Sequence, residues 1–257
     1  MEPIPLVLLP GLDGSGRLFR PFLLQLPEWI EPVVVPYPSD RAMSYGDLVE
    51  HVRPRLPVDR PFALLGESFG GPLAIRLAAE KPPQLCGLIL CGTFARNPHL
   101  WIPQVSRHLV HSVLFRLWPM IWLARRVLGL GISSEIQHEI CEAQRAVSGA
   151  ALAMRLKEVI RVDVREELRR VDVPVLSLTG LRDWIVPGWN GRAISKLCSS
   201  RQGACGFEET GFEAGHLILQ GHAAQASSVV TDFVRRMAAV GPPEQVDVLD
   251  EVEGERI

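Results

Sequence analysis

Short apolar runs recur along the chain, and most are followed by a Gly or Pro turn and then by apolar residues at helical spacing. Such alternation is typical of βαβ units, which build a parallel sheet. The runs are apolar on both sides, as strands covered by helices on both faces are. We therefore predict an α/β fold with a mostly parallel sheet and strands at Ile4–Leu9, Pro32–Pro36, Phe62–Leu65, Leu85–Cys91, Val173–Leu178 and Cys205–Glu209.

The segments between these runs carry helical periodicity. Their apolar residues recur near a period of 3.6, so one face of each helix can pack against the sheet. The pattern predicts helices over Leu18–Leu26, Ser44–Arg55, Gly70–Lys81, Gly191–Cys198 and His222–Ala239.

The alternation breaks after the strand near residue 90, because residues 95–170 keep helical periodicity without a strand-like run. We predict a helical lid there, inserted into an α/β core formed by residues 1–94 and 171–240. Three tryptophans of this segment either form the core of the lid or line a substrate pocket: Trp101, Trp118 and Trp122. A third interpretation docks the lid on a lipid surface, with flanking charges from Arg107, Arg116, Arg125 and Arg126.

The last residues, 241–257, hold two prolines and six acidic residues against one arginine. A segment of this composition has too few apolar side chains to form a core, so we predict a disordered acidic tail.

Composition narrows the class of partner. The chain is 47% hydrophobic and 22% charged, as globular proteins are, and its formal net charge is -2. This charge gives no basic field for nucleic acid or for an anionic membrane. No apolar stretch reaches the ~18 residues of a membrane span, so stable membrane insertion is not predicted. A small-molecule substrate fits better.

The five cysteines are scattered and lack the paired short spacings of a zinc site or a disulfide framework. Cys86 and Cys91 lie in an apolar run, where a thiol acts as a small hydrophobic side chain. A bridge between Cys198 and Cys205 is the alternative. The first residues are acidic, and their apolar run ends at Pro10, unlike a signal peptide. These features favour a reduced, cytoplasmic setting.

The strongest local motif is Gly66-Glu67-Ser68-Phe69-Gly70, a G-x-S-x-G between a predicted strand and a predicted helix. A nucleophile elbow needs this context, because its serine occupies a strained turn that small flanking residues allow. The alternative is a structural glycine turn. As nucleophile, Ser68 would lie at a helix N-terminus, and the amide of Phe69 would be one oxyanion donor.

A hydroxyl is a poor nucleophile at neutral pH, so Ser68 needs a base and a carboxylate that orients the base. Asp183 follows the strand Val173–Leu178 at its carboxyl end, where open α/β sheets build their sites. His216 lies in the loop before the last helix, and an imidazole with a pKa near ~6.5 can accept a proton at neutral pH. The alternatives are a solvated loop role for Asp183 and His222 as the base.

A second oxyanion donor is predicted in the loop after the first strand, Pro10–Gly16, with the amide of Leu12 as the candidate. The glycines of this loop fit neither a dinucleotide fingerprint nor a P-loop. No histidine and carboxylate pair has metal-ligand spacing, so a metal is not predicted.

The chain resembles the α/β-hydrolase superfamily. The resemblance is carried by three motifs and a turn: Gly66–Gly70, Gly180–Pro187 and Gly215-His216, in this order, and the turn Pro10–Gly16. The resemblance covers about residues 4–239. Within the superfamily, the chain resembles the lid-bearing branch, which includes small carboxylesterases and pimeloyl-carrier-protein methyl ester esterases. The resemblance implies a Ser-Asp-His triad, an acyl-enzyme intermediate and no cofactor. Two departures stand out. The chain has Pro10-Gly11 where members often carry His-Gly, and it begins at the strand usually counted third, which implies about six strands.

We therefore expect a carboxylesterase-like serine hydrolase (EC 3.1.1 type) that cleaves esters of small to medium hydrophobic acyl groups with Ser68, Asp183 and His216. A thioesterase or a carrier-protein methyl ester esterase would use the same machinery, and the fold does not choose among them. A binding protein that has kept the fold without catalysis is the remaining alternative.

Overall fold

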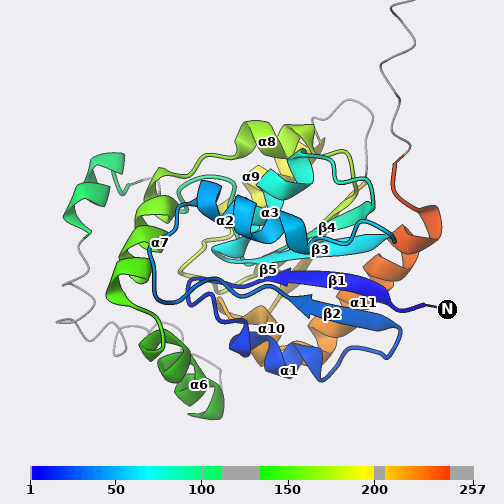
Figure 1. Cartoon of the computed structure of the whole chain (residues 1–257), viewed down its shortest axis with the longest axis horizontal. Helices are drawn as coiled ribbons and strands as arrows, with labels where there is room; N and C mark the ends of the chain where they lie inside the picture. The colour runs from blue at the N-terminus through cyan, green and yellow to red at the C-terminus, as the bar shows by residue number, and fades with distance from the viewer. Residues whose placement is uncertain (1, 100, 111–133, 200–205, 244–257) are drawn as a thin grey trace, which may run out of the picture.

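The computed structural model describes residues 2–99, 101–110, 134–199 and 206–243. Within them lies a six-stranded sheet of order β2-β1-β3-β4-β5-β6 whose neighbouring strands are all parallel. The predicted α/β fold with a mostly parallel sheet of six strands is confirmed (Figure 1). The strands are β1 (Ile4–Leu9), β2 (Ile30–Val34), β3 (Phe62–Glu67), β4 (Leu85–Cys91), β5 (Val175–Gly180) and β6 (Phe207–Phe212).

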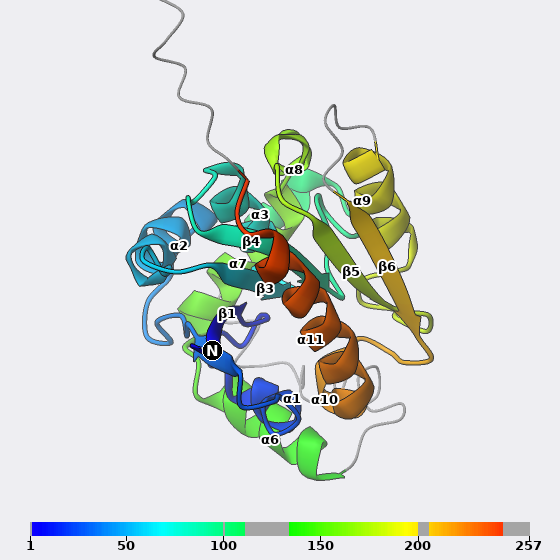
Figure 2. The ribbon, with the colours of Figure 1, turned by 90° about the vertical axis from the view of Figure 1, so that its right-hand side faces the viewer.

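Helices cover both faces of the sheet, as Figures 1 and 2 show. One face carries α2 (Tyr45–Val52), α3 (Gly70–Ala79), α8 (Arg165–Arg170) and α9 (Trp189–Ser199). The opposite face carries α1 (Arg20–Leu23), α10 (Ile218–Gly221) and α11 (Ala223–Val240). Short 3-10 helices lie in the described connections: η1 (Arg17–Phe19), η2 (Arg53–Arg55) and η3 (Gln104–Leu109).

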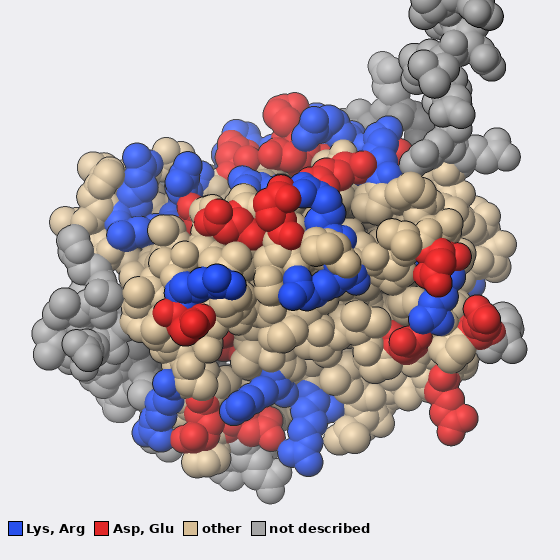
Figure 3. All heavy atoms as spheres, viewed as in Figure 1, with Lys and Arg blue, Asp and Glu red and all other residues tan. Residues whose placement is uncertain are grey.

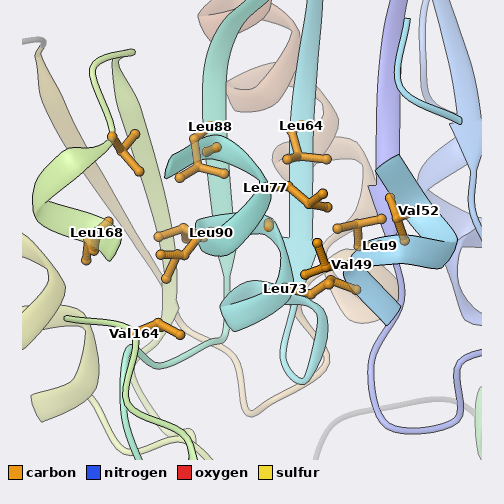
Figure 4. Close-up of a cluster of buried hydrophobic side chains, with 14 of the residues drawn as sticks. Leu9, Val49, Val52, Leu64, Leu73, Leu77, Leu88, Leu90, Val164 and Leu168 are labelled. Carbon is orange, nitrogen blue, oxygen red and sulfur yellow. The ribbon is translucent and has the colours of Figure 1, made fainter. Parts of the chain in front are cut away.

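The core consists of two hydrophobic layers, one on each side of the sheet. Successive side chains of a strand point to opposite faces, and β1 follows this rule with Leu6 and Leu8 in one layer and Val7 and Leu9 in the other. All four are fully buried, which explains why the sequence of this strand is continuously apolar. Figure 4 shows the layer beneath α2, α3 and α8, where Leu73 of α3 lies near Leu9.

Several element bounds differ from the predicted ones. The strand predicted to begin at Val173 begins at Val175, because Pro174 has no N–H to donate to a neighbouring strand. The helix predicted over residues 18–26 is split into η1 and α1 and ends at Leu23, and Leu24 beyond it is exposed. Strand β6 extends to Phe212; it pairs with β5 at the edge of the sheet, and its polar Glu208 and Glu209 hid its length from an apolar pattern.

The described part of the segment between β4 and β5 holds helices and connecting coil, with an isolated antiparallel bridge between Arg96 and Asp163. Helices α6 (Ser134–Arg145) and α7 (Gly149–Arg161) lie beyond the carboxyl ends of the strands (Figure 1). Helix α8, in contrast, packs against α3 and α9 in the core layer. The division into a core and a lid stays a prediction. Several residues named in the predictions of the lid and the tail lie outside the described residues: Trp118, Trp122, Arg116, Arg125, Arg126 and residues 244–257.

Charge is evenly mixed on the face shown in Figure 3, where acidic and basic side chains lie next to one another. Many form exposed ion pairs, such as Arg53 with Glu80 and Arg236 with Glu208. Among the helices that the structure describes, none has the length and apolar character needed to cross a bilayer.

Candidate active site

Ser68 lies in a sharp turn between β3, which ends at Glu67, and α3, which begins at Gly70. Its φ of 51° is in the left-handed region, which costs a residue with a side chain about 1–3 kcal/mol. Hydrogen bonds hold this conformation, one of them from the Gly71 N–H to the carbonyl of Ser68 (3.0 Å). The Ser68 N–H donates to the carbonyl of Cys91 (2.9 Å), and the Thr93 hydroxyl donates to the carbonyl of Ser68 (2.6 Å). The turn therefore exposes the serine hydroxyl at the carboxyl end of the sheet.

The glycine two residues before Ser68 is required by close packing. A Cβ at Gly66 would lie 2.6 Å from the carbonyl oxygen of Gly70 and 2.8 Å from the Cβ of Ala74. Both contacts are shorter than real Cβ contacts, so any side chain at this position would push α3 away from β3. The glycine of the motif thus allows the approach of helix and strand that forms the turn.

Asp183, His216 and Ser68 form a continuous hydrogen-bonded chain. Nδ1 of His216 lies 2.8 Å from Oδ2 of Asp183, and Nε2 of His216 lies 2.8 Å from Oγ of Ser68. The three residues follow β5, β6 and β3, whose carboxyl ends meet at one edge because the strands are parallel. This is the arrangement in which an imidazole can take the proton of a hydroxyl while a carboxylate fixes its tautomer.

Asp183 is held rigidly for this role. Its side chain is 1% exposed. Its second oxygen, Oδ1, accepts hydrogen bonds from the N–H groups of Ile185 (2.8 Å) and Val186 (2.9 Å). These two bonds fix the carboxylate plane and leave Oδ2 for His216, so Asp183 is no solvated loop residue.

The electrostatics around His216 favour its protonated form. Burial alone would lower the pKa of the imidazole, but the charge of Asp183, the hydrogen bond that His216 donates to Asp183 and the nearby Glu67 raise it. The balance leaves the pKa of His216 above its ordinary value. A base with a raised pKa retains a captured proton more firmly, so the surroundings favour an imidazolium at this position.

A cavity of about 380 Å³ opens beside this chain of residues. Ser68 and His216 line it together with Leu12 and Phe69, the two candidates for oxyanion donors. Among the hydrogen bonds of the described residues, none uses the amide N–H of Leu12 or of Phe69. Both predicted donors therefore border the space in which a substrate carbonyl would meet Ser68.

The walls of the cavity are mostly apolar and come from several elements. Helix α6 contributes Ile140, α7 contributes Leu156 and Val159, and the loop after Asp183 contributes Ile185. Two of these elements belong to the segment between β4 and β5, so that segment shapes the space next to Ser68. An apolar cavity of this size suits an uncharged hydrocarbon group of modest length.

The tryptophans predicted as pocket residues do not appear on the described walls of the cavity. Trp101 is 79% exposed, and its ring centre lies 5.7 Å from that of His99, which does line the cavity. Trp118 and Trp122 lie outside the described residues. The rival base, His222, precedes α11 and packs its ring edgewise on Phe212, 6.2 Å away.

Sequence reasoning missed four polar side chains around the site. Glu67 lines the cavity and is bonded by Gln220, while Tyr37 and Arg155 hold the loop that carries Leu12. Glu67 stood within the G-x-S-x-G motif, but its position there is open to any residue type. Nothing in the sequence distinguishes the other three from surface residues.

Two further predictions concern cysteines and metals. Cys86 and Cys91 are buried thiols in β4, and burial raises the pKa of Cys86 to about 11. Cys205, which the alternative interpretation pairs with Cys198, lies outside the described residues. In the described part of the chain, no three His, Cys, Asp or Glu side chains gather as metal ligands would.

Comparison with known proteins finds esterases among the similar sequences and structures. The pimeloyl-[acyl-carrier protein] methyl ester esterase of Shewanella woodyi is 27% identical over 198 residues, which are 71% of this chain and 77% of that protein. Its namesake from Xanthomonas oryzae pv. oryzae is 28% identical over 246 residues, 89% of this chain and 94% of that protein. An esterase from Exiguobacterium antarcticum shares the fold, with a TM-score of 0.75 over 91% of this chain and 92% of that one at 15% identity.

The sequence model of one protein family, described as serine aminopeptidase, S33, matches residues 35–209. This range holds more than half of the chain and includes Ser68 and Asp183. The all-parallel sheet and the strand-to-helix turn at Ser68 agree with it. The chain is therefore an α/β hydrolase of the carboxylesterase-like type and belongs to the family described as serine aminopeptidase, S33.

Proposed function

We propose that the protein hydrolyses carboxylic esters with small to medium hydrophobic acyl groups, with Ser68 as nucleophile, His216 as base and Asp183 as the group that orients the base. The observation that carries this proposal is the unbroken hydrogen-bonded chain from Asp183 through His216 to Ser68, which ends at an apolar cavity. The names of the relatives, two of which are methyl ester esterases, support it.

The reaction begins when Oγ of Ser68 attacks the ester carbonyl and its proton passes to Nε2 of His216. A tetrahedral intermediate forms, and the N–H groups of Leu12 and Phe69 bind its oxyanion. His216 then gives the proton to the leaving alkoxide, the carbon–oxygen bond breaks, and the acyl group stays on Ser68. The alcohol leaves the site.

In the second half of the reaction, water takes the place of the alcohol. His216 removes a proton from the water, whose oxygen attacks the acyl carbonyl and forms a second tetrahedral intermediate. Its collapse breaks the bond to Ser68, and His216 returns the proton to Oγ. The products are a carboxylic acid and an enzyme in its starting state, and Asp183 keeps the imidazole in the correct tautomer throughout.

A methyl ester on a carrier-bound acyl chain is a more specific candidate substrate. The two relatives named above cleave such an ester according to their names, and the chain covers 77% and 94% of their lengths. A thioester would use the same residues and the same two half reactions. The family description, serine aminopeptidase, suggests a peptide substrate. Such a substrate has less support because the cavity walls are mostly apolar.

The deciding experiment combines active-site labelling with turnover. Wild type and Ser68→Ala are treated with a fluorophosphonate probe and assayed with p-nitrophenyl esters of two to ten carbons, an acyl thioester and an aminoacyl p-nitroanilide. Labelling and ester turnover that both disappear in Ser68→Ala support the proposal. An enzyme that cleaves the anilide but none of the esters would overturn it, as would a wild type with neither labelling nor turnover.

A paired substitution tests the base. His216→Ala should lose ester turnover by orders of magnitude, because Nε2 of His216, which lies 2.8 Å from Oγ of Ser68, accepts the Ser68 proton. His222→Ala is the matched control, six residues away in the same region, and should keep near wild-type turnover. Equal losses in the two variants would argue against His216 as the base.

A further inference from the structure

Helix α7 carries two buried charged side chains that point toward the loops around Ser68. Arg155 is 2% exposed and Glu158, one turn later, is 4% exposed. A buried charge is costly unless hydrogen bonds satisfy it, so the partners of these two residues indicate what they are for. Both bond backbone groups of the core more than one hundred residues away in the sequence, and Glu158 also accepts a hydrogen bond from Arg161 (3.3 Å) on its own helix.

Arg155 binds three carbonyl oxygens. Its guanidinium donates to Leu12 (2.8 Å) and Asp13 (2.8 Å) in the loop after β1, and to Pro38 (2.9 Å) in the loop after β2. It also lies over the ring of Tyr37, with 5.6 Å from the guanidinium carbon to the ring centre. The guanidinium therefore fixes three backbone carbonyls and joins two loops at the carboxyl edge of the sheet.

Hydrogen bonds hold the peptide group that carries the Leu12 N–H and the peptide groups before and after it. The Tyr37 hydroxyl donates to the carbonyl of Pro10 (3.0 Å), and the Gly14 N–H donates to the carbonyl of Gly11 (3.0 Å). Arg155 completes the set at the carbonyl of Leu12. The Gly11 carbonyl and the Leu12 N–H belong to one planar peptide group, so the bond to that carbonyl sets the direction of the N–H.

The second predicted donor is supported from the same helix. The Tyr45 N–H donates to Oε2 of Glu158 (2.8 Å), and the Tyr45 hydroxyl donates to the carbonyl of Phe69 (2.9 Å). The rings of Tyr45 and Phe69 are stacked, with centres 4.6 Å apart. Glu158 therefore reaches the Phe69 backbone through one intermediate residue, whereas Arg155 contacts the Leu12 loop directly.

We infer that Arg155 is a positioning residue that holds the Leu12 amide in the geometry needed for the oxyanion, and that Tyr37 assists it at Pro10. This inference rests on the proposed ester hydrolysis. An oxyanion donor acts on the tetrahedral intermediate and far less on the planar ester. The loss of Arg155 therefore lowers kcat and leaves KM nearly unchanged, whereas a residue with a purely structural role changes only the amount of folded protein.

The guanidinium also places a positive charge beside the Leu12 loop. A donor that shifts by about 1 Å can cost about 10²-fold in rate, the same order as the removal of a donor. We therefore expect Arg155→Met to lower kcat about 10²-fold at a KM within about threefold of wild type. Arg155→Lys keeps the charge and can bond one or two of the carbonyls, so it should recover part of the loss.

Tyr37→Phe gives a milder test that keeps the ring and removes only the hydrogen bond to Pro10. One hydrogen bond of this kind corresponds to about a threefold to tenfold effect, so kcat should fall by that factor. Lys157→Met is the matched control, because Lys157 lies on the same helix between the two buried charges and has no described bond to either loop. Its kcat should equal that of wild type.

The four variants and wild type are compared by kcat and KM on p-nitrophenyl butanoate and by the inhibition constant of an alkyl boronic acid. The boronate becomes tetrahedral on Ser68 and places an oxygen where the oxyanion lies, so its affinity should fall in parallel with kcat. Thermal unfolding by circular dichroism gives the folded fraction of each variant.

Unchanged kcat and boronate affinity in folded Arg155→Met would overturn the inference while the ester hydrolysis of wild type stands. If Arg155→Met does not fold, Tyr37→Phe decides, and a wild-type kcat there overturns the inference. A wild type that neither turns over esters nor binds the boronate is instead a failure of the proposed function itself.

Discussion

Replacement of Glu67 by Gln tests the electrostatics next to the candidate nucleophile. Glu67 precedes Ser68, is 6% exposed, and its Oε1 accepts a hydrogen bond from Nε2 of Gln220 (2.9 Å). Burial raises the pKa of Glu67 to about 7, although Gln220 and His216 both act to lower it. The protein thus keeps an acid in its interior that ionises only near neutral pH, and its ionised form is destabilising.

The size of this effect follows from linkage. Between its ordinary pKa of 4.5 and about 7, Glu67 holds a proton in the folded protein but not in the unfolded chain. The penalty is absent below pH 4.5, grows as the pH rises, and is complete above pH 7, where it reaches about 3 kcal/mol as an upper bound. Glu67→Gln removes this penalty, so the variant should gain stability over wild type at alkaline pH.

The glutamine should fit without disturbing the site. Oε1 of Gln220 is buried and has no hydrogen-bond partner among the described residues, so an amide N–H at position 67 can donate to it after a small rotation. A protonated Glu67 can make the same bond. The substitution is therefore close to a permanent copy of the acid form.

Urea unfolding of both proteins from pH 5 to pH 9 measures the difference. We expect the advantage of Glu67→Gln to grow by about 2.5 kcal/mol across this range, which is roughly 5–10 °C in Tm for a protein of this size. The exposed Glu28→Gln is the control and should stay within about 0.5 kcal/mol of wild type at every pH. A Glu67→Gln advantage that is constant from pH 5 to pH 9 would refute the reasoning.

Three other outcomes follow from the same contacts. Asp183→Asn should lower kcat about 10⁴-fold in the ester assay with little loss of stability, and a loss below tenfold would contradict its orienting role. The acid limb of kcat/KM, which reports protonation of His216, should move to lower pH in Glu67→Gln, because Glu67 helps to raise the pKa of His216; a pH profile unchanged from wild type would argue against this coupling. Leu73→Ala should destabilise the fully buried core layer by about 2–5 kcal/mol in urea unfolding while kcat per folded molecule stays constant, so a reduced kcat would show that the layer reaches the site.

The sheet and the three candidate catalytic residues could be predicted from the sequence because they depend on short-range signals. Each strand is a local apolar run, and each of Ser68, Asp183 and His216 follows a strand within a few residues. Parallel strands then bring these residues to one edge without further information. The structure brings the three within hydrogen-bond distance, and their roles in catalysis stay predictions that the variants test.

The side chains that surround the site could not be predicted from the sequence, because their positions depend on contacts between distant segments. Arg155 reads as one more charged residue of an amphipathic helix, yet its partners lie 143 and 142 residues away. Glu158 is similar. Trp101 lies in an apolar stretch that suggested a lid core or a pocket; it is 79% exposed, and its pocket role stays a prediction.

The departure at Pro10-Gly11 can now be explained in physical terms. Members of the superfamily often carry a histidine at the first of these positions, and that side chain could help to shape the oxyanion loop. A proline cannot do so through its ring, but it restricts φ, and its carbonyl accepts the Tyr37 hydroxyl. Arg155 fixes the loop at Leu12 and Asp13, on the other side of Gly11.

In the inferred arrangement, a helix of the segment between β4 and β5 adds support for the Leu12 amide to the hydrogen bond that the Gly14 N–H makes within the loop. The same helix lines the cavity with Leu156 and Val159, which flank Arg155 and Glu158 on its surface. Any displacement of α7 would therefore change the acyl space and the oxyanion geometry together. Substitutions that reshape the cavity from α7 should for this reason affect kcat as well as KM, whereas equivalent changes at Ile185, outside this helix, should act mainly on KM.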